Sequence, residues 1–115
     1  MQTVALRRED GKIVCERCLL AETALTRMRG LLGRRYLPPG EGILLKPASS
    51  VHTLGMRFAI DVAYCDKSLT VLDSVTMAPN RIGRLRPKAK CVIEAEAGAF
   101  ERWRLCPGDE LEIRA

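Results

Sequence analysis

The sequence lacks the long apolar runs that membrane proteins and secreted precursors contain, and it has few aromatic residues. No stretch approaches the about 20 consecutive apolar residues that a membrane-spanning helix requires. Residues 1–20 contain a charged cluster where a secretion signal needs an unbroken apolar stretch, namely Arg7, Arg8, Glu9, Asp10 and Lys12. We therefore expect a cytoplasmic protein that makes no contact with a membrane.

Histidine occurs once and cysteine five times, which limits the metal and redox chemistry of the chain. Structural zinc needs four nitrogen or sulfur ligands, and no second pair completes the C-x-x-C of Cys15 and Cys18. Both cysteines lie in a strand-like stretch, where side chains three residues apart point to opposite faces. In a reducing compartment the five cysteines would remain thiols. We expect no metal, no cofactor and no disulfide.

The chain does have the composition of an ordinary globular protein. It contains 115 residues, of which 47% are hydrophobic and 29% charged, so one domain over residues 1–115 is expected. Its net charge of +5 is unevenly distributed. Residues 76–93 hold five basic and no acidic residues, namely Arg81, Arg84, Arg86, Lys88 and Lys90.

Two-residue alternation of apolar and polar residues is the dominant pattern and predicts strands. Two such stretches flank a turn at residues 9–11 and predict an antiparallel hairpin. Further strands are predicted at 42–46, 58–65, 69–77, 91–96 and 111–113, with a short helical turn at 98–105. One stretch differs, because three- and four-residue spacing of apolar residues predicts a helix over 23–33, from Thr23 to Gly33. The fold is predicted to be mainly β, a small antiparallel sandwich or partly closed barrel with one or two short helices.

Four segments of the sequence resemble a known family in their order and spacing. They are Arg29-Gly30-Leu31-Leu32-Gly33-Arg34, the stretch from His52 to Val62, the stretch from Val92 to Gly98, and Pro107-Gly108-Asp109. Together they resemble the bacterial DUF192 family, also called UPF0127, with Leu54 and Ala59 where an aromatic and a proline are usual. The resemblance implies a small β-sandwich of jelly-roll type and no established biochemical activity.

A cluster of polar residues at 52–61 is the first candidate site. His52 is the sole imidazole, and Arg57 and Asp61 follow it within ten residues. If a turn at Gly55 brings these segments together, the three side chains could border one ligand-binding cleft, although the pattern favours a structural role, because ion-pair networks produce such clusters without catalysis. Asp73 occupies an apolar row of its strand, so it must either pair with an arginine or face a polar cleft, and the same test applies to Glu94.

The basic run from Arg81 to Lys90 is the second candidate, as a basic surface. Specific nucleic-acid readers add aromatic platforms or a recognition helix, and no aromatic residue interrupts this run. We therefore expect no specific nucleic-acid binding and favour a solvated loop.

Three functions are compatible with these features. We favour a binding module for a small polar or anionic ligand or a protein partner. A small enzyme that uses His52 and Asp61 in acid-base chemistry is the first alternative. The second is a weak nucleic-acid accessory protein, which would need the basic run to be continuous with Arg27, Arg29, Arg34 and Arg35. The ligand, the catalytic residues and the oligomeric state are not specified by the sequence.

Overall fold

The computed structural model describes residues 2–114. These residues form seven strands and two short helices, joined by loops. The strands are β1 (Gln2–Arg8), β2 (Ile13–Ala21), β3 (Glu41–Leu45), β4 (Ile60–Cys65), β5 (Val71–Met77), β6 (Cys91–Glu96) and β7 (Leu111–Arg114), and the helices are α1 (Ala24–Arg29) and α2 (Ala99–Trp103). The mainly β class and the two short helices expected from the sequence are confirmed.

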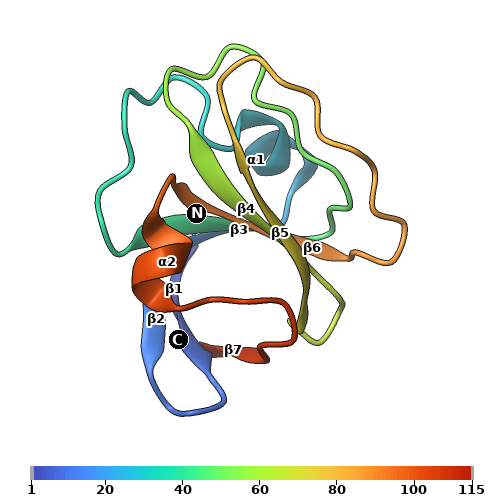
Figure 1. Cartoon of the computed structure of the whole chain (residues 1–115). Coiled ribbons are helices and arrows are strands. Elements are labelled where there is room, and N and C mark those ends of the chain that lie inside the picture. Colours follow the sequence, from blue (N-terminus) through green and yellow to red (C-terminus); the bar gives the residue numbers. More distant parts are fainter. Residues whose placement is uncertain (1, 115) are drawn as a thin grey trace.

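All seven strands form one sheet that curls into a half-barrel, in the order β5-β4-β6-β3-β2-β1-β7. Neighbours pair in antiparallel fashion except β2 and β3, which are parallel, so the sheet is mixed but mainly antiparallel, and the predicted partly closed barrel is confirmed. An isolated bridge between Thr70 and Glu110 brings the two edges of the sheet together. Figure 1 shows α1 and the long loops at one end of the barrel and α2 and β7 toward the other.

The two faces of the sheet carry separate apolar clusters, because side chains alternate along each strand. Leu44, Ala63 and Ile93 belong to the cluster inside the half-barrel, with residues from β1, β2 and α2. Their neighbours Ile43, Val62 and Val92 belong to the outer cluster, which is covered by residues from the loops. Both faces of the central strands are therefore buried, as the apolar run in 58–65 predicted.

The hairpin of β1 and β2 contains a bulge that changes the predicted position of two thiols. Val4 pairs with Cys18 and Leu6 with Cys15, so two residue steps on β1 match three on β2. This irregularity turns both sulfur atoms into the interior cluster, where the two cysteines are fully buried. The expectation that their side chains point to opposite faces is wrong. Contact with Cys15 and burial raise the pKa of Cys18.

Helix α1 is shorter than the predicted helix over 23–33, and none of its own residues is buried. Thr23 caps its start through a capping box, as the sequence indicated. It ends at Gly30, whose φ of 45° breaks the helix before the expected Gly33. Leu25 and Met28 are each 75% exposed, and of the predicted apolar stripe only Leu31 is buried.

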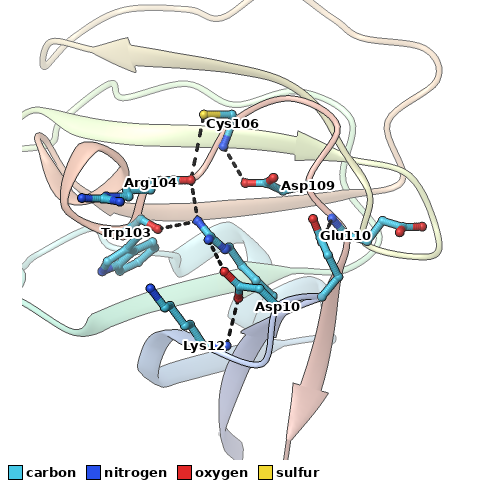
Figure 2. A network of polar contacts seen from close by, with 9 residues as sticks. Asp10, Lys12, Trp103, Arg104, Cys106, Asp109 and Glu110 are labelled. Carbon is cyan, nitrogen blue, oxygen red and sulfur yellow. Dashed lines mark hydrogen bonds and ion pairs between the residues drawn. The ribbon is translucent and has the colours of Figure 1, made fainter.

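The α2 end of the barrel is closed by a network of paired polar groups (Figure 2). The guanidinium of Arg8 donates to the carbonyl oxygens of Trp103 and Arg104, at 3.0 and 2.7 Å, and pairs with Asp10. Asp109 accepts from the backbone N–H of Cys106 at 2.8 Å. The first hairpin is thereby tied to the segment after α2.

Within residues 2–114 no helix is both long and apolar enough to cross a membrane.

Candidate functional site

A small pocket lies between the end of α1, the loop 50–56 and the outer face of the sheet. Its volume is about 90 Å³. Drug-sized ligands occupy about 300–1,000 Å³, so this pocket admits one small chemical group. Its wall is mixed: the apolar residues Leu31, Leu45, Val51 and Met56 lie beside the polar residues Arg27, Arg29, Ser50, His52 and Glu94.

Glu94 supplies the carboxyl group of the pocket. It lies in β6 between Val62 of β4 and Ile43 of β3, and its side chain faces the outer apolar cluster. It is 5% exposed and forms no hydrogen bond or ion pair with any residue from 2 to 114. Burial raises the pKa of this carboxyl from 4.5 to about 7. Such a group can accept a proton or a hydrogen bond from a ligand near neutral pH.

The turn that carries His52 is held against the loop 78–83. The hydroxyl of the buried Thr53 donates to the carbonyl oxygen of Ala78 at 2.6 Å and accepts from the N–H of Arg81 at 2.9 Å. The expected turn at Gly55 is present, with φ of 79° and its N–H bonded to the side chain of Asn80 at 3.0 Å. His52 is exposed and forms a bridge with Ile82. These bonds fix the pocket rim, and Thr53 is a contributor that sequence patterns did not reveal.

Asp61 does not line this pocket. It lies in β4, and its carboxylate contacts the start of α2. Its two oxygens accept from the hydroxyl of Thr76 at 2.6 Å and from the N–H groups of Gly98 and Phe100 at 3.0 and 3.1 Å. Arg57 is exposed, and no ion pair joins it to another residue of 2–114. His52 and Asp61 line different depressions, so the structure does not gather His52, Arg57 and Asp61 around one mouth. The residue that shares the pocket of His52 is Glu94.

Asp73 pairs with an arginine, which is one of the two arrangements the sequence allowed. Its Oδ2 accepts from Nε and Nη2 of Arg86 at 3.2 and 3.0 Å. The guanidinium of Arg86 also stacks on the ring of Tyr64, 3.9 Å from its centroid. The hydroxyl of Tyr64 is buried without a hydrogen-bond partner, and burial raises the pKa of Tyr64. This arginine therefore anchors the basic loop to the sheet.

The remaining basic residues of 81–90 lie at the surface. Arg81, Arg84, Lys88 and Lys90 are exposed, and Arg86 is partly buried. No group of three or more metal-ligating side chains lies together within residues 2–114. The five cysteines are free thiols, and Cys106 alone among them is exposed.

A mainly β half-barrel with a small pocket under its outer loops, lined by one acid and two arginines, is the class of protein that these features define. The sequence profile of DUF192, described as "Uncharacterized ACR, COG1430", matches residues 5–113. The chain belongs to this family.

Two curated relatives carry the family name UPF0127. One from Thermococcus sibiricus is 28% identical over 93% of this chain and 72% of its own length. Another from Pyrococcus furiosus is 31% identical over 89% of this chain and 90% of its own length. The family is thus not confined to bacteria.

Two solved structures share the fold. A Novosphingobium aromaticivorans protein of unknown function has a TM-score of 0.79 and 21% identity, covering 96% of this chain and 83% of its own. A Sinorhizobium meliloti protein, described as a candidate transcription regulator, has a TM-score of 0.83 and 24% identity, covering 96% and 92%. At these identities the likeness establishes the fold alone.

Proposed function

We propose that this protein is a small binding module whose pocket captures one polar group of a ligand through Glu94. The observation that carries this proposal is an acid, Glu94, that is 5% exposed as a residue, lines a pocket and forms no hydrogen bond or ion pair with any residue from 2 to 114. An unpartnered buried carboxylate is costly, because its lost hydration is not replaced by hydrogen bonds. A bound group that donates a hydrogen bond would replace it.

The chemistry of the pocket narrows the ligand class. Glu94 accepts hydrogen bonds when ionised and would repel a negatively charged group at the same position. A hydroxyl or amine on a short apolar stem fits the carboxyl and the aliphatic walls of Leu31, Val51 and Met56. At Glu94 itself a neutral or cationic polar group is therefore better suited than an anionic one, while Arg27 and Arg29 also line the pocket.

The enzyme alternative with His52 and Asp61 lacks a comparable observation. Both oxygens of Asp61 are engaged by three donors around α2, which suits a structural acid. No hydrogen bond connects it to His52.

Native mass spectrometry of freshly purified protein tests the proposal. We expect a bound small molecule in the wild type, loss of that molecule in Glu94→Gln, and retention in Glu16→Gln, a control at an exposed position of β2.

A second measurement covers the case of a ligand lost during purification. Methylamine, ethanolamine and acetate are titrated while the amide NMR signals of residues 50–56 are followed. The proposal expects shifts with the two amines that Glu94→Gln abolishes. Equal shifts in both proteins, a response to acetate alone, or no response to any of the three contradicts it.

A further inference from the structure

The basic residues of this chain are concentrated in three segments that contain no acid. These segments are 24–36, 46–59 and 78–90, and we call them together the basic loop surface. They hold eleven of the 19 basic residues and none of the 14 acidic ones. The eleven are Arg27, Arg29, Arg34, Arg35, Lys46, Arg57, Arg81, Arg84, Arg86, Lys88 and Lys90. The rest of the chain is therefore net acidic, although the whole is basic.

Direct contacts bring the three segments together at one end of the half-barrel. The N–H of Gly83 donates to the carbonyl oxygen of Val51 at 2.8 Å, and the N–H of Arg86 donates to that of Ser49 at 3.0 Å. A Cβ built on Gly55 would lie 3.6 Å from the side chain of Leu32. In Figure 1 the green and the yellow-to-orange loops run over the same end of the molecule as α1.

The same surface also carries most of the exposed apolar side chains. Ten large hydrophobic residues are exposed in residues 2–114, and seven of them belong to these segments: Leu25, Met28, Leu32, Tyr36, Leu54, Ile82 and Leu85. Ile82 is 79% and Leu85 57% exposed. A hydrophobic surface of this kind, surrounded by charges, marks an interaction site.

Two depressions lie in this surface beside residues 81–88. One, of about 540 Å³, is lined by Leu72, Leu85 and Pro87 together with Arg84, Lys88 and the paired Asp73 and Arg86. The other, of about 440 Å³, is lined by Met77, Ile82, Arg81 and Arg84, among others. Apolar hollows edged by arginines can hold the side chains of a peptide and pair with its acids at the same time.

Charge and shape together identify the kind of partner. Arg29, Arg57, Arg81 and Arg84 form no ion pair with any residue of 2–114, so these cations are available. Nucleic acid would favour stacking aromatics, whereas the exposed apolar residues here are aliphatic apart from Tyr36. A lipid bilayer presents no side chains to fill the two hollows. We propose that the basic loop surface binds an acidic segment of a partner protein that also carries large apolar side chains.

Selection from a library of random peptides tests which sequences this surface binds. A phage-displayed library of peptides of about 12 residues is selected on the wild-type protein at moderate salt. The expected winners have net negative charge and at least two large apolar residues. Enrichment of basic or uncharged peptides, or no enrichment, overturns the proposal.

Matched variants then locate the binding. The enriched peptide, labelled with fluorescein, is titrated by fluorescence anisotropy against Arg81→Glu/Arg84→Glu and Ile82→Ser/Leu85→Ser. Each pair is expected to weaken binding by roughly tenfold or more. Lys67→Glu and Ile113→Ser change exposed residues outside the surface and should leave the affinity unchanged. Thermal melts followed by circular dichroism should show equal stability for all four sets, because each alters exposed residues only.

Competing occupants are measured in the same format. Labelled single- and double-stranded DNA of mixed sequence, and vesicles of phosphatidylcholine with phosphatidylglycerol, are titrated at the same salt. If either binds more tightly than the peptide and is weakened by the same variants, the partner class is wrong. Glu94→Gln should bind the peptide normally, so failure of the pocket and failure of this surface are distinguishable.

Discussion

The two ends of the half-barrel treat their polar groups in opposite ways. Around α2, Arg8 is paired with Asp10 and two carbonyl oxygens, and Asp61 accepts three hydrogen bonds. Under the loops at the other end, the hydroxyl of Tyr64 is buried without a partner, and Glu94, which is 5% exposed and lines a pocket, forms no hydrogen bond or ion pair with any residue from 2 to 114. Folding alone explains paired polar groups, since they offset the cost of burial. Unpaired ones reduce stability and point to a role in binding.

Removal of the paired acid should have the largest effect. Asp61→Ala would leave the N–H groups of Gly98 and Phe100 without an acceptor inside the molecule. We expect a loss of about 3 to 5 kcal/mol in the free energy of unfolding, measured by urea denaturation. Asp61→Asn keeps one oxygen acceptor and should lose less. Equal stability of Asp61→Ala and the wild type would show that α2 does not depend on this acid.

Replacement of the unpaired acid, Glu94, should raise the free energy of unfolding, and the size of this effect should depend on pH. The pKa of Glu94 is raised to about 7 in the folded protein, against 4.5 as its ordinary value. The folded state then binds more protons than the unfolded state between these values, so stability falls as pH rises through this window. From about pH 5 to about pH 8, the wild type should lose about 2 to 3 kcal/mol more than Glu94→Gln. If the free energy of unfolding of the two proteins changes with pH in the same way, the contrast between the two ends of the half-barrel is wrong.

Arg86 is an exception at the loop end, as the buried Thr53 is, because its polar groups are paired. It binds Asp73 and stacks on Tyr64, and its side chain is 15% exposed. Arg86→Ala should lower the free energy of unfolding by about 1 to 2 kcal/mol. Arg86→Lys keeps the charge but not the planar stack, and we expect an intermediate value in thermal melts. If the lysine variant equals the wild type, stacking on Tyr64 contributes nothing.

The thiols should produce the smallest effect on stability and a clear one on reactivity. Burial raises the pKa of Cys65 to about 12 and raises that of Cys91, while Cys106 is exposed. Native protein titrated with a disulfide reagent should react at one thiol per chain, and the others only after unfolding. Cys106→Ser should abolish the native reaction and change stability by less than about 0.5 kcal/mol. Rapid reaction of that variant would contradict the burial of the interior thiols.

The strands could be predicted because two-residue alternation is a local property. The hairpin turn at 9–11, the apolar run of β4 and the irregular 79–87 connection all follow from nearby residues. The bulge at Cys15 and Cys18 does not, because it depends on the register that β1 adopts. The parallel pairing of β2 with β3 likewise depends on the path of the chain between them.

The candidate site was predicted in part. Closeness in sequence suggested His52, Arg57 and Asp61 as one site. The side chain of Asp61, however, points to the face of β4 opposite Ile60 and Val62 and hydrogen-bonds to the start of α2. The useful signal was an acid in an apolar row, which was Asp73, and the same test applied to Glu94. Only the fold distinguishes them, because Asp73 is paired with Arg86, which is 13 residues away in sequence. Glu94 forms no ion pair with any residue from 2 to 114, although Arg27 and Arg29 line its pocket.

The pKa of Glu94 is the measurement that tests the central claim most directly. Carbon-detected NMR titration of the side-chain carboxyl signals, with Glu94 assigned by its absence in Glu94→Gln, gives this value in the ligand-free protein. We predict a pKa of about 7, because burial without a partner disfavours the ionised carboxylate. A pKa at or below its ordinary value of 4.5 would show that the carboxylate is already hydrated or paired. The pocket would then have no unsatisfied acid to offer a ligand.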